Sequence, residues 1–547
     1  MTRPLGSLLD ALRNPGIRAL EVASAAWAAA EAAYLVGLFV FAFGIDGPYG
    51  VAIVGVVRTL PSIVLAPLAV VFGGGRRLDT WLRSMLAVRL MAVTIAGLAL
   101  ATGTAIAVVY LLAALDAVLA TLLRPIRGAF LPALARTPDE LVAANVATST
   151  GESLANLVGP GVAALLLLTG GPALPFAAGT VLLAISLVAA VTIPVPPPLP
   201  STGRRSRDTG LPGLRTVLAT RPIPRTVVLV FTGQRFVRGM LTVLIVATAI
   251  DHLRMGDAGV GLLTAAIGLG GLAGGGIAAS LVAGASLAPA FVIAVVAWGI
   301  ALSVTGLFAI PGVAIVVLAF GGAAKVALDV AGFSLLQRTV PNESRATLLA
   351  AQEGAVTAAL ALGAVAASLL VDSAGTASAL VIAGLVPAVL AAASWPVIRR
   401  ADRESVVPER DRRLLQSVPM FRPLPLTAIE ELAASLDRRP IAAGEAAVRE
   451  GDPGDAFYII DQGRFEAVVD GRATRELGPG DSFGEIALVR SVPRTATVRA
   501  IDDGVLVEVG RDDFLAAVTG HGEASRIAEE VVRTRLAGSG DRPAHEV

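Results

Sequence analysis

The sequence contains no cysteine, three histidines and a single lysine, Lys325. Without cysteine, neither a disulfide framework nor a thiolate metal site can form, and so few histidines disfavour a zinc site. The formal net charge is +1 and the arginines are spread along the chain, so we expect no nucleic acid partner, whose binding needs a concentrated basic face. The first residues are polar and interrupted by proline, which disfavours a cleavable signal peptide.

Apolar residues, in contrast, are abundant. They make up 55% of the chain, in addition to 58 glycines, and the mean hydropathy is +0.74. Soluble domains seldom have such a composition. The charged residues are concentrated after Pro396. The sequence therefore predicts a long membrane part followed by a smaller soluble domain.

Apolar windows of roughly 20 residues, long enough to cross the hydrocarbon core of a lipid bilayer, follow one another up to Pro396. A linker rich in proline and arginine divides them into two groups of six. Arginines gather in alternate loops, which places those loops, both termini and the soluble domain in the cytoplasm of a multi-pass protein of the inner (plasma) membrane. We predict about twelve spans, at 18–43, 49–72, 80–101, 104–123, 142–168, 172–193, 226–249, 257–283, 286–309, 313–334, 346–371 and 376–396.

The predicted fold class is thus an all-α membrane domain of two six-helix halves, followed by a cytoplasmic β-roll with flanking helices. The predicted domains are the N-terminal half at 1–193, a linker at 194–225, the C-terminal half at 226–398, a linker at 399–413, the β-roll domain at 414–536 and a disordered tail at 537–547.

Charged residues inside the predicted spans are candidates for transport or proton coupling. A charge at mid-bilayer costs about 2.5–3.5 kcal/mol on insertion, so each needs a partner or a water-filled path. In one interpretation Glu31 or Asp116 takes up and releases a proton; in the other, these groups form fixed ion pairs between helices. Lys325 and Asp329 lie four residues apart on one helix face, which favours a fixed pair. The candidates are Glu31, Arg58, Asp116, Arg235, Lys325 and Asp329.

Two segments of the membrane part carry a family resemblance. RPIRGAFLPALARTPDELVAANVATS at 124–149 resembles the helix 4 to helix 5 segment of drug and siderophore exporters of the major facilitator superfamily, and NLVGPGVAA at 156–164 is similar to their antiporter motif. GGGRRLDTWLR at 73–83 departs from the family's helix 2 to helix 3 motif, because its acidic residue is displaced. The resemblance, over about 15–398, implies proton-coupled export of a hydrophobic or amphipathic small molecule by alternating access.

The soluble part carries a second resemblance. After Leu414, short alternating strands separated by glycines predict a small β-roll. Within it, FGEIALVRSVPRTATV at 483–498 closely resembles the phosphate-binding cassette of cyclic nucleotide-binding domains, as in protein kinase A regulatory subunits and the catabolite activator protein. The resemblance covers roughly 412–536 and implies a regulatory cyclic nucleotide. We expect cAMP, with cGMP as the alternative, because the arginine-rich, lysine-poor composition is typical of actinobacterial proteins and cAMP is the commoner bacterial messenger.

The residue types of this cassette suit the chemistry of a cyclic nucleotide. Glu485 can accept a hydrogen bond from the ribose 2′-OH, and Arg494 offers a forked donor to the phosphate oxygens. A helical turn that begins near Gly484 directs backbone N–H groups toward the sugar-phosphate ring. The predicted binding residues are Phe483, Gly484, Glu485, Ile486, Ala487, Arg494, Thr495 and Ala496.

Together the two resemblances predict a secondary transporter regulated by a cyclic nucleotide. Two alternatives stay open: a flippase for lipids or lipid precursors, and a membrane-anchored nucleotide sensor that does not transport. We expect no enzymatic activity, because the sequence has neither a Walker-type loop nor a recognisable nucleophile triad.

Overall fold

A computed structural model of the chain divides into two compact units, Met1–Ser405 and Val406–Val547, which we call the helical unit and the β-roll unit. Much of the predicted linker 194–225, the first part of the motif at 73–83, part of the predicted linker 399–413 and most of the predicted tail 537–547 lie outside the described residues. The structure describes residues 12–72, 78–103, 106–135, 138–194, 222–282, 288–339, 342–405, 409–424, 428–429, 432–433, 435–520 and 522–538.

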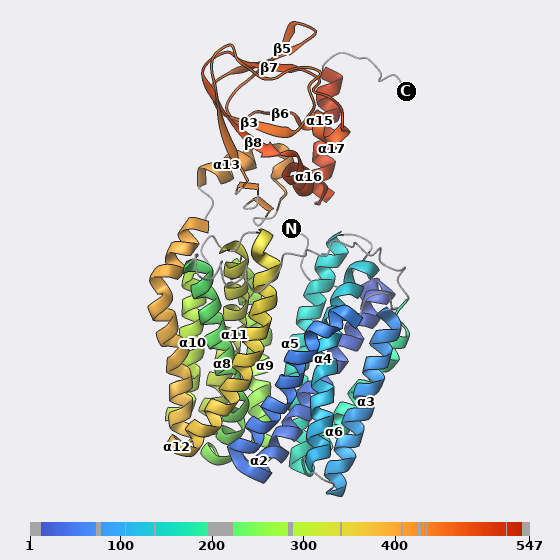
Figure 1. Cartoon of the computed structure of the whole chain (residues 1–547), viewed down its shortest axis with the longest axis vertical. Coiled ribbons are helices and arrows are strands. Elements are labelled where there is room, and N and C mark those ends of the chain that lie inside the picture. The colour runs from blue at the N-terminus through green and yellow to red at the C-terminus, as the bar shows by residue number, and fades with distance from the viewer. Residues whose placement is uncertain are drawn as a thin grey trace. The chain divides into compact units, whose positions relative to one another are not determined.

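The helical unit consists of long apolar helices. In Figure 1, helices α2 to α6 form one group and helices α8 to α12 form another. The elements are α2 (Pro15–Phe72), α3 (Leu78–Thr102), α4 (Ile106–Leu134), α5 (Pro138–Thr169), α6 (Leu174–Val191), α8 (Pro222–Ala247), a π-helical turn η1 (Thr248–His252), α9 (Gly256–Val282), α10 (Ala288–Leu307), α11 (Pro311–Thr339) and α12 (Asn342–Ser405).

Two of these helices, α2 and α12, each contain a sharp break. Helix α2 leaves helical geometry at Asp46 and Gly47, and Gly47 has a φ of 54°. The chain reverses there and brings Gly50 close to Ala42. A Cβ added at Gly50 would overlap the carbonyl oxygen of Ala42. Helix α12 breaks at Gly375, whose φ is 78° and ψ is 164°. Glycine suits these turns because its lack of a Cβ permits positive φ.

Among the described residues, ten helices are long and apolar enough to cross a membrane. The two broken helices account for the difference from the predicted count of about twelve, because each contains two of the predicted spans. The spans predicted at 18–43 and 49–72 are the two arms of α2, and those at 346–371 and 376–396 are the two arms of α12. The predicted fold class is confirmed for this part of the chain.

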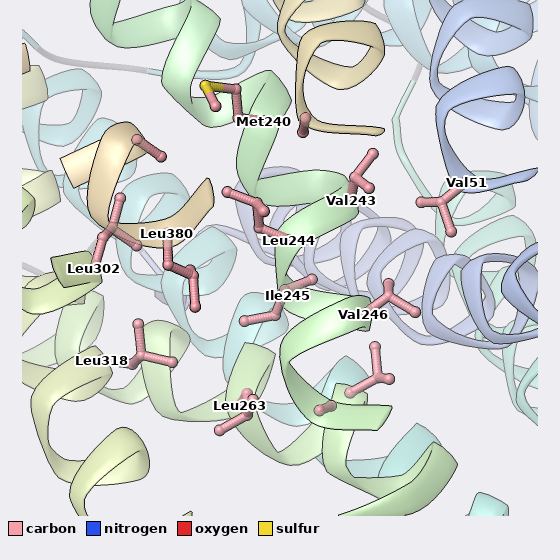
Figure 2. Packing of buried hydrophobic residues seen from close by; sticks show 14 of the residues in the cluster. Val51, Met240, Val243, Leu244, Ile245, Val246, Leu263, Leu302, Leu318 and Leu380 are labelled. Atoms are coloured by element: carbon pink, nitrogen blue, oxygen red, sulfur yellow. The ribbon is translucent and has the colours of Figure 1, made fainter. Parts of the chain in front are cut away.

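Small residues allow the helices of the second group to approach closely. A Cβ added at Gly239 of α8 would lie 2.1 Å from the Leu360 carbonyl oxygen of α12, and one added at Gly299 of α10 would lie 2.3 Å from the Gly384 carbonyl oxygen of α12. Such contacts are typical of helix association in membranes, where burial of apolar surface from water does not drive packing. Figure 2 shows the large apolar cluster beside them, with Leu244 of α8 near Leu380.

The β-roll unit contains two four-stranded antiparallel sheets and several short helices. The strand order is β1-β8-β3-β6 in one sheet and β2-β7-β4-β5 in the other. The elements are α13 (Glu409–Ser417), a 3₁₀ turn η2 (Pro419–Phe421), β1 (Asp437–Ile441), β2 (Ala446–Val448), β3 (Ala456–Gln462), β4 (Phe465–Val469), β5 (Arg472–Leu477), β6 (Ser482–Phe483), α15 (Glu485–Arg490), β7 (Thr497–Ala500), β8 (Gly504–Gly510), α16 (Arg511–Thr519) and α17 (Gly522–Gly538).

The β-roll unit has hydrophobic clusters of its own. In one, the ring of Phe457 on β3 stacks 4.8 Å from that of Phe514 on α16, and Phe421 meets both rings edge-on at 5.5 and 6.0 Å. Helix α17 adds Ala528 and Val532 to the same cluster. The second cluster fills the space between the two sheets, around Phe465. These buried aromatic side chains fix the helices against one sheet face and so position the cassette.

Candidate functional site

The segment predicted as the phosphate-binding cassette forms a strand, a glycine turn and a short helix. Strand β6 ends at Phe483, Gly484 adopts a φ of 97°, and α15 begins at Glu485. A Cβ added at Gly484 would lie 2.5 Å from Nη1 of Arg494 and 3.1 Å from the carbonyl oxygen of Ala456. Glycine is therefore required at this position both for the backbone conformation and for space.

Glu485 is buried at the start of α15, with 1% of its surface exposed. Its Oε2 lies 2.8 Å from Nη1 of Arg535 on α17, at ion-pair distance. The same guanidinium donates a hydrogen bond of 2.8 Å to the Ser482 carbonyl oxygen. Oε2 of Glu485 has this ion pair but no donor aligned for a hydrogen bond among the described residues. A buried carboxylate oxygen in this condition can accept a bond from a ligand hydroxyl.

Arg494 is also buried, 4% exposed, and it lies under the glycine turn. Its Nη2 donates to the Ala456 carbonyl oxygen at 2.8 Å and to Oδ1 of Asp455 at 3.2 Å, and its Nη1 donates to the Gly484 carbonyl oxygen at 3.3 Å. The guanidinium carbon also lies 5.4 Å from the ring centre of Tyr458. These contacts fix the orientation of the guanidinium before any ligand arrives.

The loop that precedes β3 is joined to the cassette by its backbone. The N–H of Gly451 donates to the Arg494 carbonyl oxygen at 2.9 Å, and the N–H of Arg494 donates to the Asp452 carbonyl oxygen at 2.8 Å. Gly454 packs on α15, because a Cβ there would lie 2.5 Å from the Cβ of Ala487. The loop and the cassette therefore form one rigid structure around the Arg494 side chain.

The remaining predicted residues differ in their surroundings. Phe483 is buried and stacks on Tyr458 with ring centres 5.2 Å apart, so it contributes to the core beneath the cassette. Ala487 is buried, Ile486 and Ala496 are half-buried, and Thr495 is exposed. Thr495 is thus the member of this set whose side chain faces solvent.

The cassette has the groups that a small anionic ligand with a free hydroxyl needs. It combines a buried guanidinium, a buried carboxylate and a glycine whose lack of a Cβ leaves room for the Arg494 guanidinium. Burial, together with the charges of Glu508 and Asp455, raises the pKa of Tyr458, so the ring behind Arg494 stays neutral. The arrangement fits a cyclic nucleotide phosphate on Arg494 and a ribose hydroxyl on Glu485.

In the helical unit, three candidate residues of the N-terminal half meet in one cluster. Glu31 and Arg58 come from the two arms of α2, and their Oε1 and Nη2 atoms are 3.1 Å apart. Asp116 of α4 lies 3.4 Å from Arg58 and 2.7 Å from Nε of Arg89 on α3. Arg89 also reaches Oε2 of Glu31 at 3.3 Å, and the Tyr34 hydroxyl donates to Asp116. This four-charge network (Glu31, Arg58, Arg89, Asp116) is neutral.

The other three candidates meet in the C-terminal half. Asp329 of α11 forms ion pairs with two cations. Its Oδ2 lies 3.0 Å from Nζ of Lys325, and its Oδ1 lies 3.4 Å from Nη2 of Arg235 on α8. We call this group the triad (Arg235, Lys325, Asp329). The four-residue spacing predicts the Lys325 to Asp329 pair, but nothing in the sequence indicates that Arg235 joins it.

Comparison with protein families agrees with both parts of this description. The family model for the cyclic nucleotide-binding domain matches residues 438–521, and the model for the Major Facilitator Superfamily matches residues 227–443. The chain joins a major facilitator segment to a cyclic nucleotide-binding domain. The long apolar helices of the major facilitator part agree with a multi-pass membrane protein.

Similar proteins match the nucleotide-binding domain. The cAMP-dependent protein kinase regulatory subunit of Emericella nidulans is 39% identical over 102 residues, which are 18% of this chain and 25% of that protein. An uncharacterized protein of Mycobacterium tuberculosis is 39% identical over 121 residues, 21% of this chain and 24% of that protein. The chain therefore spans about a quarter of the length of these curated relatives.

One solved structure also matches a part of this chain. It is a co-crystal structure of the regulatory domain of Toxoplasma gondii PKA with cAMP. The identity is 34%, the match covers 20% of this chain and 43% of that chain, and the TM-score is 0.20.

Two residues of the cyclic nucleotide-binding domain site are not among the predicted binding residues. Asp455 pairs with Arg494, although the two are 39 positions apart, and Arg535 pairs with Glu485 from the end of α17. The only signal in the sequence is that both lie in segments expected beside the cassette, the loop before AFYIID and the last helix. Arg89 is not among the predicted candidates, although it is a charged residue inside the span predicted at 80–101.

Proposed function

We propose that the chain is a secondary transporter whose activity is regulated by a cyclic nucleotide bound at the cassette of the β-roll unit. The observation that carries the proposal is that the cassette buries both a guanidinium, Arg494, and a carboxylate, Glu485, whose Oε2 contacts only Arg535 among the described ion pairs. The ligand's phosphate accepts from Arg494, and its ribose 2′-OH donates to Glu485. We propose cAMP rather than cGMP as the natural ligand.

Further polar contacts come from the start of α15 and from the segment after Arg494. We propose that the backbone N–H groups of Ile486 and Ala487 donate to the sugar-phosphate ring, as the first N–H groups of a helix have no partner within it. Ala496 adds a backbone donor and Thr495 a hydroxyl. Gly484 keeps the backbone close to the ligand, and Phe483 supports it from below.

Transport proceeds, in this proposal, by alternating access between the two groups of helices, with export of a hydrophobic or amphipathic small molecule across the inner membrane. Both termini and the β-roll unit lie in the cytoplasm. Glu31 is 24% exposed in its side chain and Asp116 only 1%, so Glu31 is the better candidate to exchange a proton with water. Proton uptake by Glu31 would release Arg58 and loosen the four-charge network.

Regulation requires that the nucleotide bind one transport state more tightly than another, because a ligand shifts a conformational equilibrium only by its differential affinity. The β-roll unit follows α12 after a short connection, so a change in the β-roll unit is transmitted along the chain to the last span.

The proposal is tested by isothermal titration calorimetry of the full chain in lipid nanodiscs with cAMP and cGMP. We expect saturable binding with a preference for cAMP. Arg494→Ala should weaken binding by roughly thirtyfold or more, as truncation of a buried, hydrogen-bonded charge does. Arg499→Ala is the matched control, because Arg499 lies on the neighbouring strand, is exposed and pairs with Glu466. Absence of binding by the wild-type chain, or equal effects of the two substitutions, would refute the assigned site.

Transport itself is tested in vesicles with an imposed proton gradient. Flux of a hydrophobic dye that responds to the gradient, is lost in Glu31→Gln and changes on addition of cAMP would agree with the proposal. A chain that binds the nucleotide but shows no flux of dyes or labelled lipids would instead be a membrane-anchored sensor. Movement of labelled lipids alone would identify a flippase.

A further inference from the structure

The triad in the C-terminal half carries more positive than negative charge. Two cations, Arg235 and Lys325, share the single carboxylate of Asp329. Their side chains are 18%, 20% and 25% exposed, so the group is enclosed but can be reached. Arg238, one turn along α8 from Arg235, adds a further positive charge that interacts electrostatically with Lys325 and Asp329.

The contacts within the triad leave polar atoms unsatisfied. Nε of Arg235 is buried and makes no hydrogen bond with the described residues, and Oδ1 of Asp329 also lacks one although it lies 3.4 Å from Arg235. Among the described residues, no second carboxylate lies within ion-pair distance of Arg235 or Lys325. A buried cation without a full partner is costly, so a structural ion pair alone is a poor explanation of this group.

The N-terminal half shows what a balanced cluster looks like in the same protein. In the four-charge network two guanidinium groups face two carboxylates, and each carboxylate contacts both arginines. The charges of that network therefore balance. Those of the triad do not, and the charge it lacks is negative.

The surroundings of the triad are apolar. The guanidinium carbon of Arg235 lies 5.0 Å from the ring centre of Phe231. A buried apolar cluster of α8, α10 and α11 lies beside it and includes Val230, Phe291 and Leu328. The triad therefore combines an excess of positive charge with neighbouring hydrocarbon side chains.

We propose that the triad binds the anionic group, a carboxylate or phosphate, of an amphipathic substrate, with Arg235 and Lys325 as the binding residues. Asp329 holds the two cations when no substrate is present, and the substrate's anionic group takes its place. This inference rests on the proposed transport function and narrows its substrate class from hydrophobic or amphipathic molecules to anionic amphiphiles.

The test measures binding of three probes of equal chain length to the full chain in nanodiscs: pyrenedodecanoate, its methyl ester and pyrenedodecylamine. Energy transfer from tryptophan to pyrene reports binding, since Trp298 and the other three tryptophans lie in the helical unit. We expect the anion to bind more tightly than the ester and the amine. Arg235→Gln and Lys325→Gln should each weaken anion binding by roughly tenfold or more and leave ester binding unchanged.

Asp329→Asn gives the sharpest outcome, because it removes the competing carboxylate and should strengthen binding of the anion. A purely structural triad predicts the opposite. Arg83→Gln, which replaces an arginine that donates to carbonyl oxygens at the end of α6, is the matched control and should have no effect on the ratio of anion to ester binding.

The proposal would be overturned by equal binding of the three probes, by no binding of the anion, or by weaker anion binding in Asp329→Asn. Competition with unlabelled dodecanoate and with inorganic phosphate separates two sources of the anionic group. Displacement by dodecanoate alone supports an amphiphile, whereas equal displacement by inorganic phosphate assigns the site to free anions and refutes the amphiphile. Tryptophan-detected unfolding of the same samples shows whether the helical unit of each variant is folded, and binding of cAMP shows whether the proposed nucleotide site stands independently.

Discussion

At the scale of single residues, two charges of the four-charge network are almost completely buried. Arg89 and Asp116 are 0% and 1% exposed, whereas Glu31 at the edge of the network is 24% exposed. A buried ion pair contributes little net stability compared with an apolar pair, but removal of one member leaves a charge without compensation. The residues of this network therefore differ in what their loss should cost.

We expect Asp116→Asn to lower the free energy of unfolding of the helical unit by about 3–5 kcal/mol, because the buried Arg89 loses its nearest carboxylate. Thermal unfolding in detergent, followed by tryptophan fluorescence, measures the effect. The double variant Arg89→Gln/Asp116→Asn should recover much of the loss, since no charge is left unpaired at that position. Arg464→Gln, which breaks an exposed pair with Asp502, should cost less than about 1 kcal/mol. If Asp116→Asn unfolds like the wild-type chain, the ion pairs are not formed as described.

A second residue-scale feature is Glu508 on β8. Burial, followed by the nearby charges of Asp455 and Asp437, raises the pKa of this carboxyl, against the opposing effects of Arg439 and Arg494. The folded state therefore holds the proton more tightly than the unfolded state does. The resulting stabilisation is complete below the ordinary carboxyl pKa and is lost as the pH rises through the raised pKa.

Glu508→Gln should accordingly raise the unfolding temperature of the β-roll unit near neutral pH and have no such benefit at about pH 4. Differential scanning calorimetry of both chains across this pH range checks the sign. A benefit that grows as the pH falls would contradict the proposed cause.

At the scale of elements, the strand, turn and helix of the cassette depend on one glycine. Gly484→Ala places a Cβ 2.5 Å from Nη1 of Arg494 and forces a residue other than glycine to a φ of 97°. We expect a loss of about 1–3 kcal/mol in the free energy of unfolding and loss of measurable cAMP binding, because Arg494 must move.

Gly471→Ala is the matched control for this substitution. Gly471 has a φ of 77° in the turn between β4 and β5, but a Cβ there meets no atom within 4 Å. The control should lower the free energy of unfolding by a similar amount, because alanine is also unfavourable at a φ of 77°. It should leave the affinity for the nucleotide unchanged. Equal loss of binding in both variants would show that backbone strain, rather than the clash with Arg494, is responsible.

Elements were easier to predict than the contacts between them. The alternation of apolar residues and glycines in 456–510 is a local pattern, so the β-roll and the turn at Gly484 follow from it. The break of α2 is also local, in GIDGP. The contact of Arg535 with Glu485 spans 50 positions and depends on how α17 packs on the core through Ala528, which no local pattern encodes.

The partners of the intramembrane charges also depend on contacts between distant segments. The cost of burial identifies Glu31, Arg58 and Asp116 as residues that need partners, but it does not say which partners they have. The arrangement of α2, α3 and α4 decides that, and it adds Arg89 and Tyr34 to the group. The limits of the predicted domains and the ligand-binding roles of the cassette residues stay predictions.

At the scale of the whole molecule, the two compact units have separate hydrophobic clusters. A nucleotide that binds the β-roll unit should therefore stabilise that unit first, by about 2.7 kcal/mol at a concentration one hundred times the dissociation constant. Calorimetry of the full chain in nanodiscs should show two transitions, of which cAMP shifts that of the β-roll unit.

Tryptophan fluorescence distinguishes the units, because all four tryptophans lie in the helical unit. We expect cAMP to move the tryptophan-detected transition much less than the calorimetric transition of the β-roll unit, and Arg494→Ala to abolish both shifts. Equal shifts of the two transitions would mean that the units unfold as one, and the description of two independent cores would be wrong.

The single lysine has a practical consequence. Besides the amino terminus, Lys325 carries the only primary amine of the chain, and its side chain is 20% exposed within the triad. An amine-reactive reagent of suitable size thus modifies one internal position of the unaltered protein, and mass spectrometry can follow the rate. A candidate substrate that binds at the triad should slow the acylation of Lys325. The acylation rate can therefore be used to screen candidate substrates without any engineered label.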